Sequence, residues 1–139
     1  MRIEELDETF VEHAAVLWEG VGLTRSWNDP RQDFLRALRG ETSGVLGALD
    51  GDALVGTAMV GADGHRGWVY YVAVAPSHQR RGVGRLLLQG AESWLARRDV
   101  PKVQLMVRGT NTAARGFYER LGYDDARTVV LGRWLHEPR

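Results

Sequence analysis

The sequence predicts a mixed α/β fold in which one mostly antiparallel sheet carries about four helices. An Asp-Gly turn at residues 50–52 separates two apolar stretches, which is typical of an antiparallel β-hairpin. Farther along, an amphipathic helical pattern separates an apolar run at 68–75 from another apolar stretch at 103–108. Such an order predicts two parallel neighbours joined by a right-handed crossover, which would be the fourth and fifth strands of the sheet.

Composition restricts the class of protein. The 139 residues, 44% of them hydrophobic, predict a single soluble globular domain over residues 1–139. Lysine plus arginine equals aspartate plus glutamate, 18 each, so no overall charge favours a nucleic acid or a membrane as partner. Without cysteine there is no disulfide, thiolate zinc site or cysteine nucleophile. Residues 1–7 lack an apolar signal core, and we expect a cytoplasmic protein.

The first 40 residues predict a short strand at 2–6 and two helices. The first helix should span about residues 7–19, because apolar side chains recur there at helical spacing. They are Phe10, Ala14, Leu17, Trp18 and Val21. The second should span about 30–38, because Asp29 is a favourable N-cap before a proline at the first helical position.

The loop between these helices, residues 20–30, combines glycines with Trp27, Asn28 and Asp29. Loops that carry aromatic and polar groups often line pockets, so these residues are candidates for acceptor contacts. The alternative is that Trp27 covers the core while Asn28 and Asp29 begin the helix. Both interpretations stay open from the sequence.

Three apolar stretches then follow one another, at 45–49, 53–60 and 68–75, with glycine-rich turns between them. They predict an antiparallel meander. The third stretch is rich in β-branched and aromatic residues, which indicates a strand buried on both faces.

A segment rich in glycine and cations follows this strand and precedes a helical pattern. Its residues are Gln79, Arg80, Arg81, Gly82, Val83, Gly84 and Arg85. A helix that begins at Arg81 or Gly82 exposes unpaired N–H groups at its positive end, and glycine lets an anion approach the backbone. The segment therefore predicts a pyrophosphate site, although an ordinary strand-to-helix turn is the alternative. No Walker A string occurs, and Leu87 replaces the third glycine of a dinucleotide fingerprint.

The last predicted helix spans about residues 111–121 and ends at Gly122, a typical C-cap residue. Asn111 and Tyr118 are seven residues apart, close to two turns, and can face one ligand. Since ligands bind at the carboxyl ends of parallel strands, residues 75–84 and 108–111 should lie at one edge. Residues 123–135 suit one or two closing strands.

Two of these segments match motifs of a known family. Residues 79–84 fit (Q/R)-x-x-G-x-(G/A), and residues 111–123 fit N-x-x-A-x-x-(F/L)-Y-x-x-x-G-(F/Y). The chain thereby resembles the GNAT family of acetyl-CoA-dependent N-acetyltransferases, whose order of elements also fits. Residues 26–30 and 63–67 resemble the small bacterial YpeA branch of that family.

The resemblance implies helices on both faces of the sheet, acetyl-CoA as cosubstrate and a primary amine as acceptor. The pantetheine arm would lie along the fourth strand at Val72, Ala73 and Val74, and the pyrophosphate on N–H groups of residues 81–85. Asn111 would lie near the thioester and Tyr118 near the sulfur. In direct attack by the amine, Tyr118 could protonate the leaving thiolate, since a phenol is protonated at neutral pH. An N–H near Val72 or Val74 could polarise the thioester carbonyl.

Several features of the reaction stay open. Some relatives carry a glutamate base on the fourth strand, but residues 68–75 contain no carboxylate. The remaining candidates are Tyr70, Tyr71, His65, Asp29, Asp63 or an ordered water. Tyr71 also joins Trp27, Asn28 and Asp29 as a candidate acceptor contact.

Partners and ligands follow from the same reasoning. The histidines show no metal-ligand spacing, so we expect no metal. The acceptor would be a small-molecule or peptide amine, with no nucleic acid or membrane partner, and a homodimer is left open. Two other functions compete with catalysis: a non-catalytic acetyl-CoA sensor or structural module, and a site for another phosphate ligand such as a nucleotide.

Overall fold

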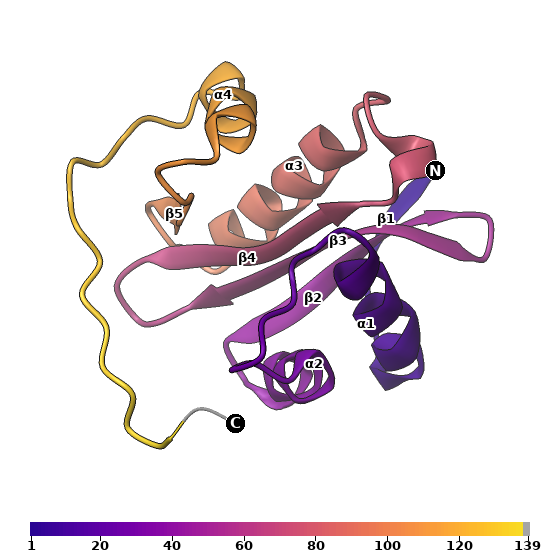
Figure 1. Ribbon diagram of the computed structural model, residues 1–139. Coiled ribbons are helices and arrows are strands. Elements are labelled where there is room, and N and C mark those ends of the chain that lie inside the picture. Colours follow the sequence, from indigo (N-terminus) through magenta and orange to yellow (C-terminus); the bar gives the residue numbers. More distant parts are fainter. Residues whose placement is uncertain (138–139) are drawn as a thin grey trace. The chain divides into compact units, whose positions relative to one another are not determined.

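The computed structural model describes residues 1–137, and the chain divides into two compact units, Met1–Leu105 and Met106–Arg139. The first unit contains one five-stranded sheet, three α-helices and two short 3-10 turns (Figure 1). Its elements in order are β1 (Arg2–Glu5), a 3-10 turn (Glu8–Phe10), α1 (Val11–Gly20), α2 (Pro30–Arg39), β2 (Ser43–Asp50), β3 (Ala53–Ala62), β4 (Gly67–Val74), a 3-10 turn (Pro76–His78), α3 (Val83–Ala96) and β5 (Val103–Leu105). The second unit carries α4 (Thr112–Arg120).

The sheet has the strand order β1-β2-β3-β4-β5. The first four strands pair antiparallel with their neighbours, and β4 pairs parallel with β5. The predicted fold class, a mostly antiparallel sheet whose fourth and fifth strands are parallel, is confirmed. Pairing of β4 with β5 covers only Gly67–Val69, opposite Val103–Leu105. The fifth strand is therefore shorter than the predicted stretch at 103–108.

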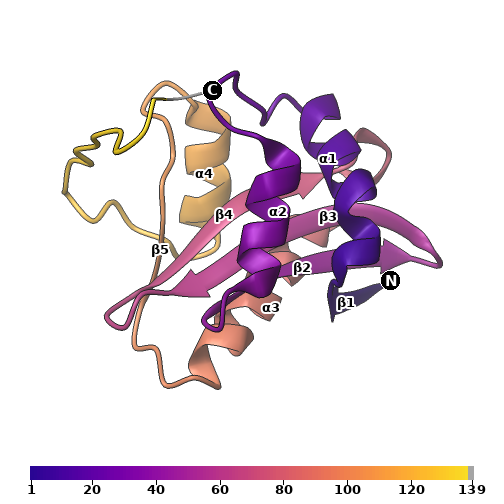
Figure 2. The same ribbon diagram turned by 90° about the horizontal axis from the view of Figure 1, so that it is seen from below.

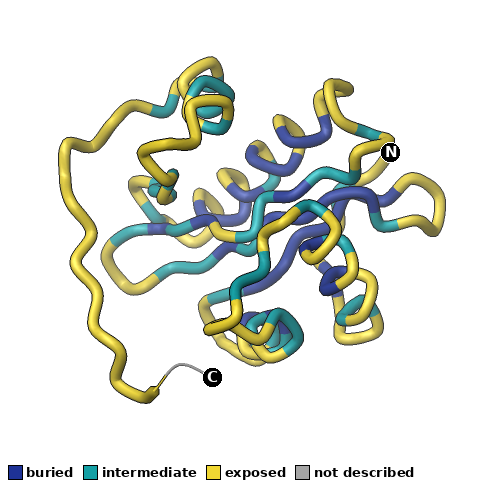
Figure 3. Tube along the Cα trace, viewed as in Figure 1, coloured by how far each residue is buried: buried dark blue, intermediate teal, exposed yellow. Residues whose placement is uncertain are grey.

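Helices cover both faces of this sheet, as Figure 2 shows from a second direction. One face packs against α3, with Val60, Leu87 and Trp94 in the shared core. The other packs against α1 and α2, with Trp18 and Phe34 fully buried. The central strands are accordingly the most buried part of this unit (Figure 3). Both layers follow from the apolar stripes of the helices and the buried strands between them.

Helix α3 lies very close to β3. A β-carbon placed on Gly56 would stand 2.9 Å from Leu87 Cδ1 and 3.0 Å from the carbonyl oxygen of Ala73. Glycine is thus required where the first turns of the helix cross the sheet. This close packing fixes the start of α3 relative to the end of β4.

Strand β4 contains a β-bulge. Met59 pairs with Tyr70, and Thr57 pairs with Ala73. Between these two pairs the chain advances two residues along β3 but three along β4, so β4 carries one extra residue. Tyr71 lies within the bulge in the left-handed region, with φ 51°. The prediction that this strand is buried on both faces is correct only in part, because 43% of the Tyr70 surface is exposed.

Two other predictions differ from the structure. The first helix begins with the 3-10 turn at Glu8–Phe10 and becomes α-helical only at Val11. The closing strands predicted for residues 123–135 are wrong, because that segment contains no strand. Asp125 accepts a hydrogen bond from the Arg127 N–H at 2.7 Å, and Arg127 has φ 56°, which interrupts extended backbone. Within residues 1–137, no helix is long and apolar enough to cross a membrane.

Candidate active site

The predicted pyrophosphate site is the N-terminus of α3. The helix begins at Val83, one residue after its N-cap Gly82, which has φ 79° and ψ 10°. Its first backbone hydrogen bond runs from the Leu86 N–H to the Gly82 carbonyl at 3.1 Å. Because i to i−4 bonding starts there, the N–H groups of Val83, Gly84 and Arg85 have no partner within the helix. No side chain of the described residues caps this end, which leaves the donors and the positive helix dipole available to an anion.

The turn before α3 is held by its own side chains. Gln79 donates from Nε2 to the carbonyl oxygen of Val74 at 3.1 Å, so its amide fixes the end of β4. His78 Nε2 lies 2.9 Å from Oδ2 of Asp50, the last residue of β2. Arg80 adopts φ 63°, and a β-carbon on Gly82 would have no atom within 4 Å. The space over the helix start is therefore open, and the turn beneath it is anchored at two points.

The edge of β4 that faces away from β3 is the predicted pantetheine surface. The Ala75 N–H bonds to the Val55 carbonyl at 2.8 Å, and Thr57 pairs with Ala73, so the alternate residues Ala73 and Ala75 face β3. The N–H groups of Val72 and Val74 consequently point to the opposite edge. Pairing with β5 ends at Val69, before this stretch. Val72 and Val74 thus fit backbone contacts to a ligand, whereas the N–H and C=O of Ala73 point to β3.

The loop at 20–30 does not bury its tryptophan. Trp27 is 43% exposed and is not among the residues packed against either core cluster, which favours the acceptor-contact interpretation over one in which it covers the core. The side chain of Asp29 accepts from the N–H groups of Arg31 and Gln32, at 3.0 and 3.3 Å, so its predicted role as N-cap is confirmed. Asn28 bonds through its own N–H to the Arg25 carbonyl at 3.0 Å.

The candidate bases differ in their availability. Asp63 accepts from the N–H groups of His65 and Arg66 and from Trp68 Nε1, and the Arg66 bond is the main cause that lowers the Asp63 pKa. Burial raises the pKa values of Tyr70 and Tyr71, and the bond from Tyr71 to Asp33 raises the latter further. Both phenols therefore keep their protons at neutral pH. Neither tyrosine, nor Asp63, is suited to accept a proton from an amine.

A group of side chains that sequence reasoning missed surrounds Tyr71. The Tyr71 hydroxyl donates to Asp33 Oδ2 at 2.7 Å, and the ring stacks on Trp18 with centroids 3.9 Å apart. Trp18 Nε1 donates to Thr57 Oγ1 at 2.8 Å, and Thr57 Oγ1 donates to the Tyr71 carbonyl at 2.8 Å. One signal was available, because Thr57 is the only polar side chain in the apolar stretch 53–62.

The second unit holds Asn111 and Tyr118. Asn111 is the N-cap of α4, and its Oδ1 accepts from the Ala114 N–H at 3.1 Å. Tyr118 lies in the last turns of α4, with Phe117 and Tyr123 rings at 5.1 and 6.0 Å. Burial raises the Tyr118 pKa, so its phenol is protonated at neutral pH and can act as a proton donor.

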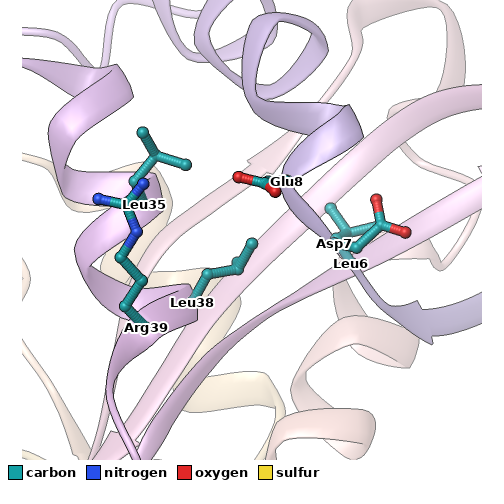
Figure 4. A pocket seen from close by; sticks show the side chains of 6 residues that line it. All are labelled: Leu6, Asp7, Glu8, Leu35, Leu38 and Arg39. Atoms are coloured by element: carbon teal, nitrogen blue, oxygen red, sulfur yellow. The ribbon is translucent and has the colours of Figure 1, made fainter.

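A surface cavity of about 440 Å³ lies elsewhere in the first unit (Figure 4). Its walls come from residues 6–8 and from α2, and they include none of the residues predicted to bind cofactor or acceptor. The lining side chains are Leu6, Asp7, Glu8, Leu35, Leu38 and Arg39. Across the described part of the chain, no group of three or more histidine, cysteine, aspartate or glutamate side chains could hold a metal ion.

An uncapped helix start, preceded by a left-handed glycine and a bulged strand, presents backbone N–H groups whose chemistry suits an anionic, extended ligand. The family model described as the acetyltransferase (GNAT) family matches residues 5–123. The chain belongs to the GNAT family of acetyltransferases. This confirms the family predicted from the motifs at 79–84 and 111–123.

One similar protein is acetyltransferase YE1169 from Yersinia enterocolitica serotype O:8 / biotype 1B, which is 39% identical over 135 residues. The match covers 97% of this chain and 96% of that protein.

Solved structures share the fold at lower identity. The aminoglycoside acetyltransferase AAC(6')-Iy, in complex with the bisubstrate analogue CoA-S-monomethyl-acetylneamine, has a TM-score of 0.83 at 17% identity. That match covers 96% of this chain and 97% of the other. A variant of BH1408 from Bacillus halodurans has a TM-score of 0.78 at 23% identity, covering 96% of this chain and all of its own.

Proposed function

We propose that this protein transfers an acetyl group from acetyl-CoA to a primary amine by direct attack of the amine on the thioester. The observation that carries the proposal is the start of α3. Three N–H groups there lack partners within the helix, and a β-carbon on the preceding Gly82 would meet no atom within 4 Å. In this proposal residues 1–139 act as one acetyltransferase domain in the cytoplasm. Membership of the acetyltransferase family supports the transfer of an acetyl group.

Acetyl-CoA would bind along the first unit through backbone atoms. Its pyrophosphate would accept hydrogen bonds from Val83, Gly84 and Arg85, where the helix dipole favours negative charge. Its pantetheine amides would pair with the free edge of β4 along Val72 and Val74, through backbone groups other than the N–H that faces the thioester carbonyl. Arg80 and Arg81 add positive charge to the turn. The structural relative AAC(6')-Iy has been solved in complex with CoA, and this supports acetyl-CoA as the cosubstrate here.

The reaction needs one donor for the leaving group and one donor for the carbonyl. As the amine nitrogen bonds to the carbonyl carbon, the C=O electrons move onto oxygen, and an N–H of Val72 or Val74 stabilises that charge. When the C–S bond breaks, CoA leaves as a thiolate and Tyr118 gives it a proton. The raised Tyr118 pKa supports this role, since the phenol stays protonated.

The amine must also lose a proton. Tyr70 and Tyr71 hold their own protons, Asp63 is engaged by three donors, and Asp29 caps α2. We therefore assign the amine proton to water, with His65 as the remaining side-chain candidate. Trp27, which is exposed, Asn28 and Tyr71 remain the proposed contacts to the acceptor, whereas the Asp29 side chain is used as the N-cap of α2. Structural relatives named as aminoglycoside acetyltransferases, one of them in complex with sisomicin, favour an amine of small-molecule size.

The test is release of CoA from acetyl-CoA across a library of primary amines, with wild-type protein and a Tyr118→Phe variant. We expect at least one amine to be acetylated, and the variant to turn over about 10²-fold more slowly, a typical contribution of a general acid. Phe117→Tyr, a matched change in the neighbouring residue, should leave the rate near wild type. Equal rates for wild type and Tyr118→Phe would remove Tyr118 as the acid. Absence of turnover with every amine, together with tight acetyl-CoA binding, would favour a sensor or structural module.

A further inference from the structure

The peptide unit between Tyr71 and Val72 is held by two hydrogen bonds in series that begin in the core. The buried Trp18 indole donates to Thr57 Oγ1, and Thr57 Oγ1 donates to the Tyr71 carbonyl oxygen, both at 2.8 Å. Both Trp18 and Thr57 are fully buried. An indole N–H can only donate, so the Thr57 oxygen is the acceptor of the first bond and its single proton serves the second. The direction of the whole series is thereby fixed.

This series sets the direction of the Val72 N–H. The Tyr71–Val72 peptide bond is trans, so its C=O and N–H point to opposite sides. With the Tyr71 carbonyl turned to Thr57, the Val72 N–H points away from that residue. The bulge has the same effect, because without the extra residue Thr57 would pair with Val72 in place of Ala73, and the Val72 N–H would point to β3.

The backbone conformation that allows this is unfavourable for tyrosine. Tyr71 has φ 51°, in a region where a β-carbon crowds the following carbonyl. The side chain is held from two helices: its ring stacks on Trp18 of α1, and its hydroxyl donates to Asp33 of α2 at 2.7 Å. Strained residues persist where the surroundings over-determine them, often at sites that use the resulting geometry. The group around Tyr71 fits that description.

We propose that Trp18 and Thr57 position the Val72 N–H to donate a hydrogen bond to the acetyl carbonyl oxygen of the bound thioester. The inference rests on the acetyl transfer proposed above, and what it adds is the role of these two buried side chains in holding the donor. Neither Trp18 nor Thr57 touches the substrate; both act through the peptide unit. A donor held in place before the reaction stabilises the oxyanion without reorganisation, which is why its support extends into the core.

The test compares Thr57→Val, which keeps the shape and removes the hydroxyl, with Thr57→Ser, which keeps the hydroxyl. We expect kcat to fall about 10- to 100-fold in Thr57→Val, within the range for a lost or misdirected oxyanion donor. The Kd for CoA, which lacks the acetyl carbonyl, should stay within about threefold because the α3 site is untouched. Thr57→Ser should restore kcat to within about threefold of wild type. Val45→Ala, a buried change on β2, is the control for general destabilisation and should keep kcat.

If wild type acetylates an amine and Thr57→Val does so with the same kcat, the positioning role is overturned and the proposed function stays intact. Equal losses in Thr57→Val and Thr57→Ser, or a matching loss in CoA affinity, would also overturn it. Wild type inactive on every amine would instead remove the proposed function. Trp18→Phe tests the first bond and serves if Thr57→Val does not fold. We expect its kcat to fall about threefold to tenfold, and an unchanged rate would overturn the role of Trp18.

Discussion

Replacement of Gly82 by glutamate tests the pyrophosphate site directly. Gly82 has φ 79°, and a β-carbon there would meet no atom within 4 Å. A side chain at this position therefore carries a conformational cost of about 1–2 kcal/mol but no clash within the described chain. A carboxylate beside the helix start would not add to that cost, because negative charge is favourable at a helix N-terminus. The free energy of unfolding should therefore fall by no more than about 1–2 kcal/mol.

The effect on CoA binding should be much larger. A glutamate carboxylate about 5 Å from one phosphate charge, at an effective dielectric of 20 to 80, is repelled by roughly 1–3 kcal/mol. That corresponds to a Kd about 5- to 150-fold weaker than in a neutral variant of the same size. The matched control is Gly82→Gln, which has the same bulk and the same backbone strain without the charge.

The assay is calorimetric titration with CoA at low and high salt, accompanied by thermal melting of each variant. We expect Gly82→Glu to bind more weakly than Gly82→Gln, and the gap to narrow at high salt because the repulsion is screened. Similar melting temperatures for the two variants would show that the difference comes from the ligand. Equal Kd values for Glu and Gln at low salt would refute the assignment of the pyrophosphate to this helix start.

Two further predictions concern packing and pH. Gly56→Ala should lower the free energy of unfolding by about 1–3 kcal/mol, because its β-carbon would lie 2.9 Å from Leu87 Cδ1 and 3.0 Å from the Ala73 carbonyl, and denaturant titration measures this. Gly51→Ala is the comparison variant. Its β-carbon meets no atom within 4 Å, so any loss of stability there comes from the positive φ of 62° and not from crowding. The pH profile of kcat should lose activity only above pH 10, because burial raises the Tyr118 pKa above its usual value and the phenol must stay protonated to donate. A fall in kcat centred below pH 10 that disappears in Tyr118→Phe would contradict this assignment.

Much of the fold was predictable because its signals are local. The Asp-Gly turn between β2 and β3 and the Asp29 cap before Pro30 each act over a few residues. Gly82 was singled out from the sequence as room for an anion beside the backbone, but its left-handed N-cap conformation was not predicted, and the helix begins at Val83 rather than at Arg81 or Gly82. The family motifs at 79–84 and 111–123 then identified the class of protein, which the family model confirms.

The acceptor side was much less predictable, because its geometry depends on contacts distant in sequence. Tyr71 gives no local indication of a left-handed backbone, and a uniform strand was expected there. Its conformation depends on Thr57, 14 residues away, and on Asp33, 38 residues away. Asp33 had no visible role as one polar residue on an amphipathic helix. The strands predicted for residues 123–135 were wrong although the local signal was present. The alternation there is typical of strands, but Arg127 interrupts the extended backbone with a positive φ.

The energy balance at Tyr71 connects these observations. A left-handed tyrosine costs roughly 1–2 kcal/mol, which would normally suffice to choose an unbulged strand. Stacking on Trp18 contributes about 0.5–1.5 kcal/mol, and a hydrogen bond to the half-buried Asp33 carboxylate about 1–2 kcal/mol, so the bulge is offset by its neighbours. A buried threonine that merely packed would gain nothing from this arrangement over valine. Thr57 instead satisfies the buried Trp18 indole and fixes the Tyr71 carbonyl, so its hydroxyl stabilises the core and, in the proposal above, also sets the direction of the Val72 N–H.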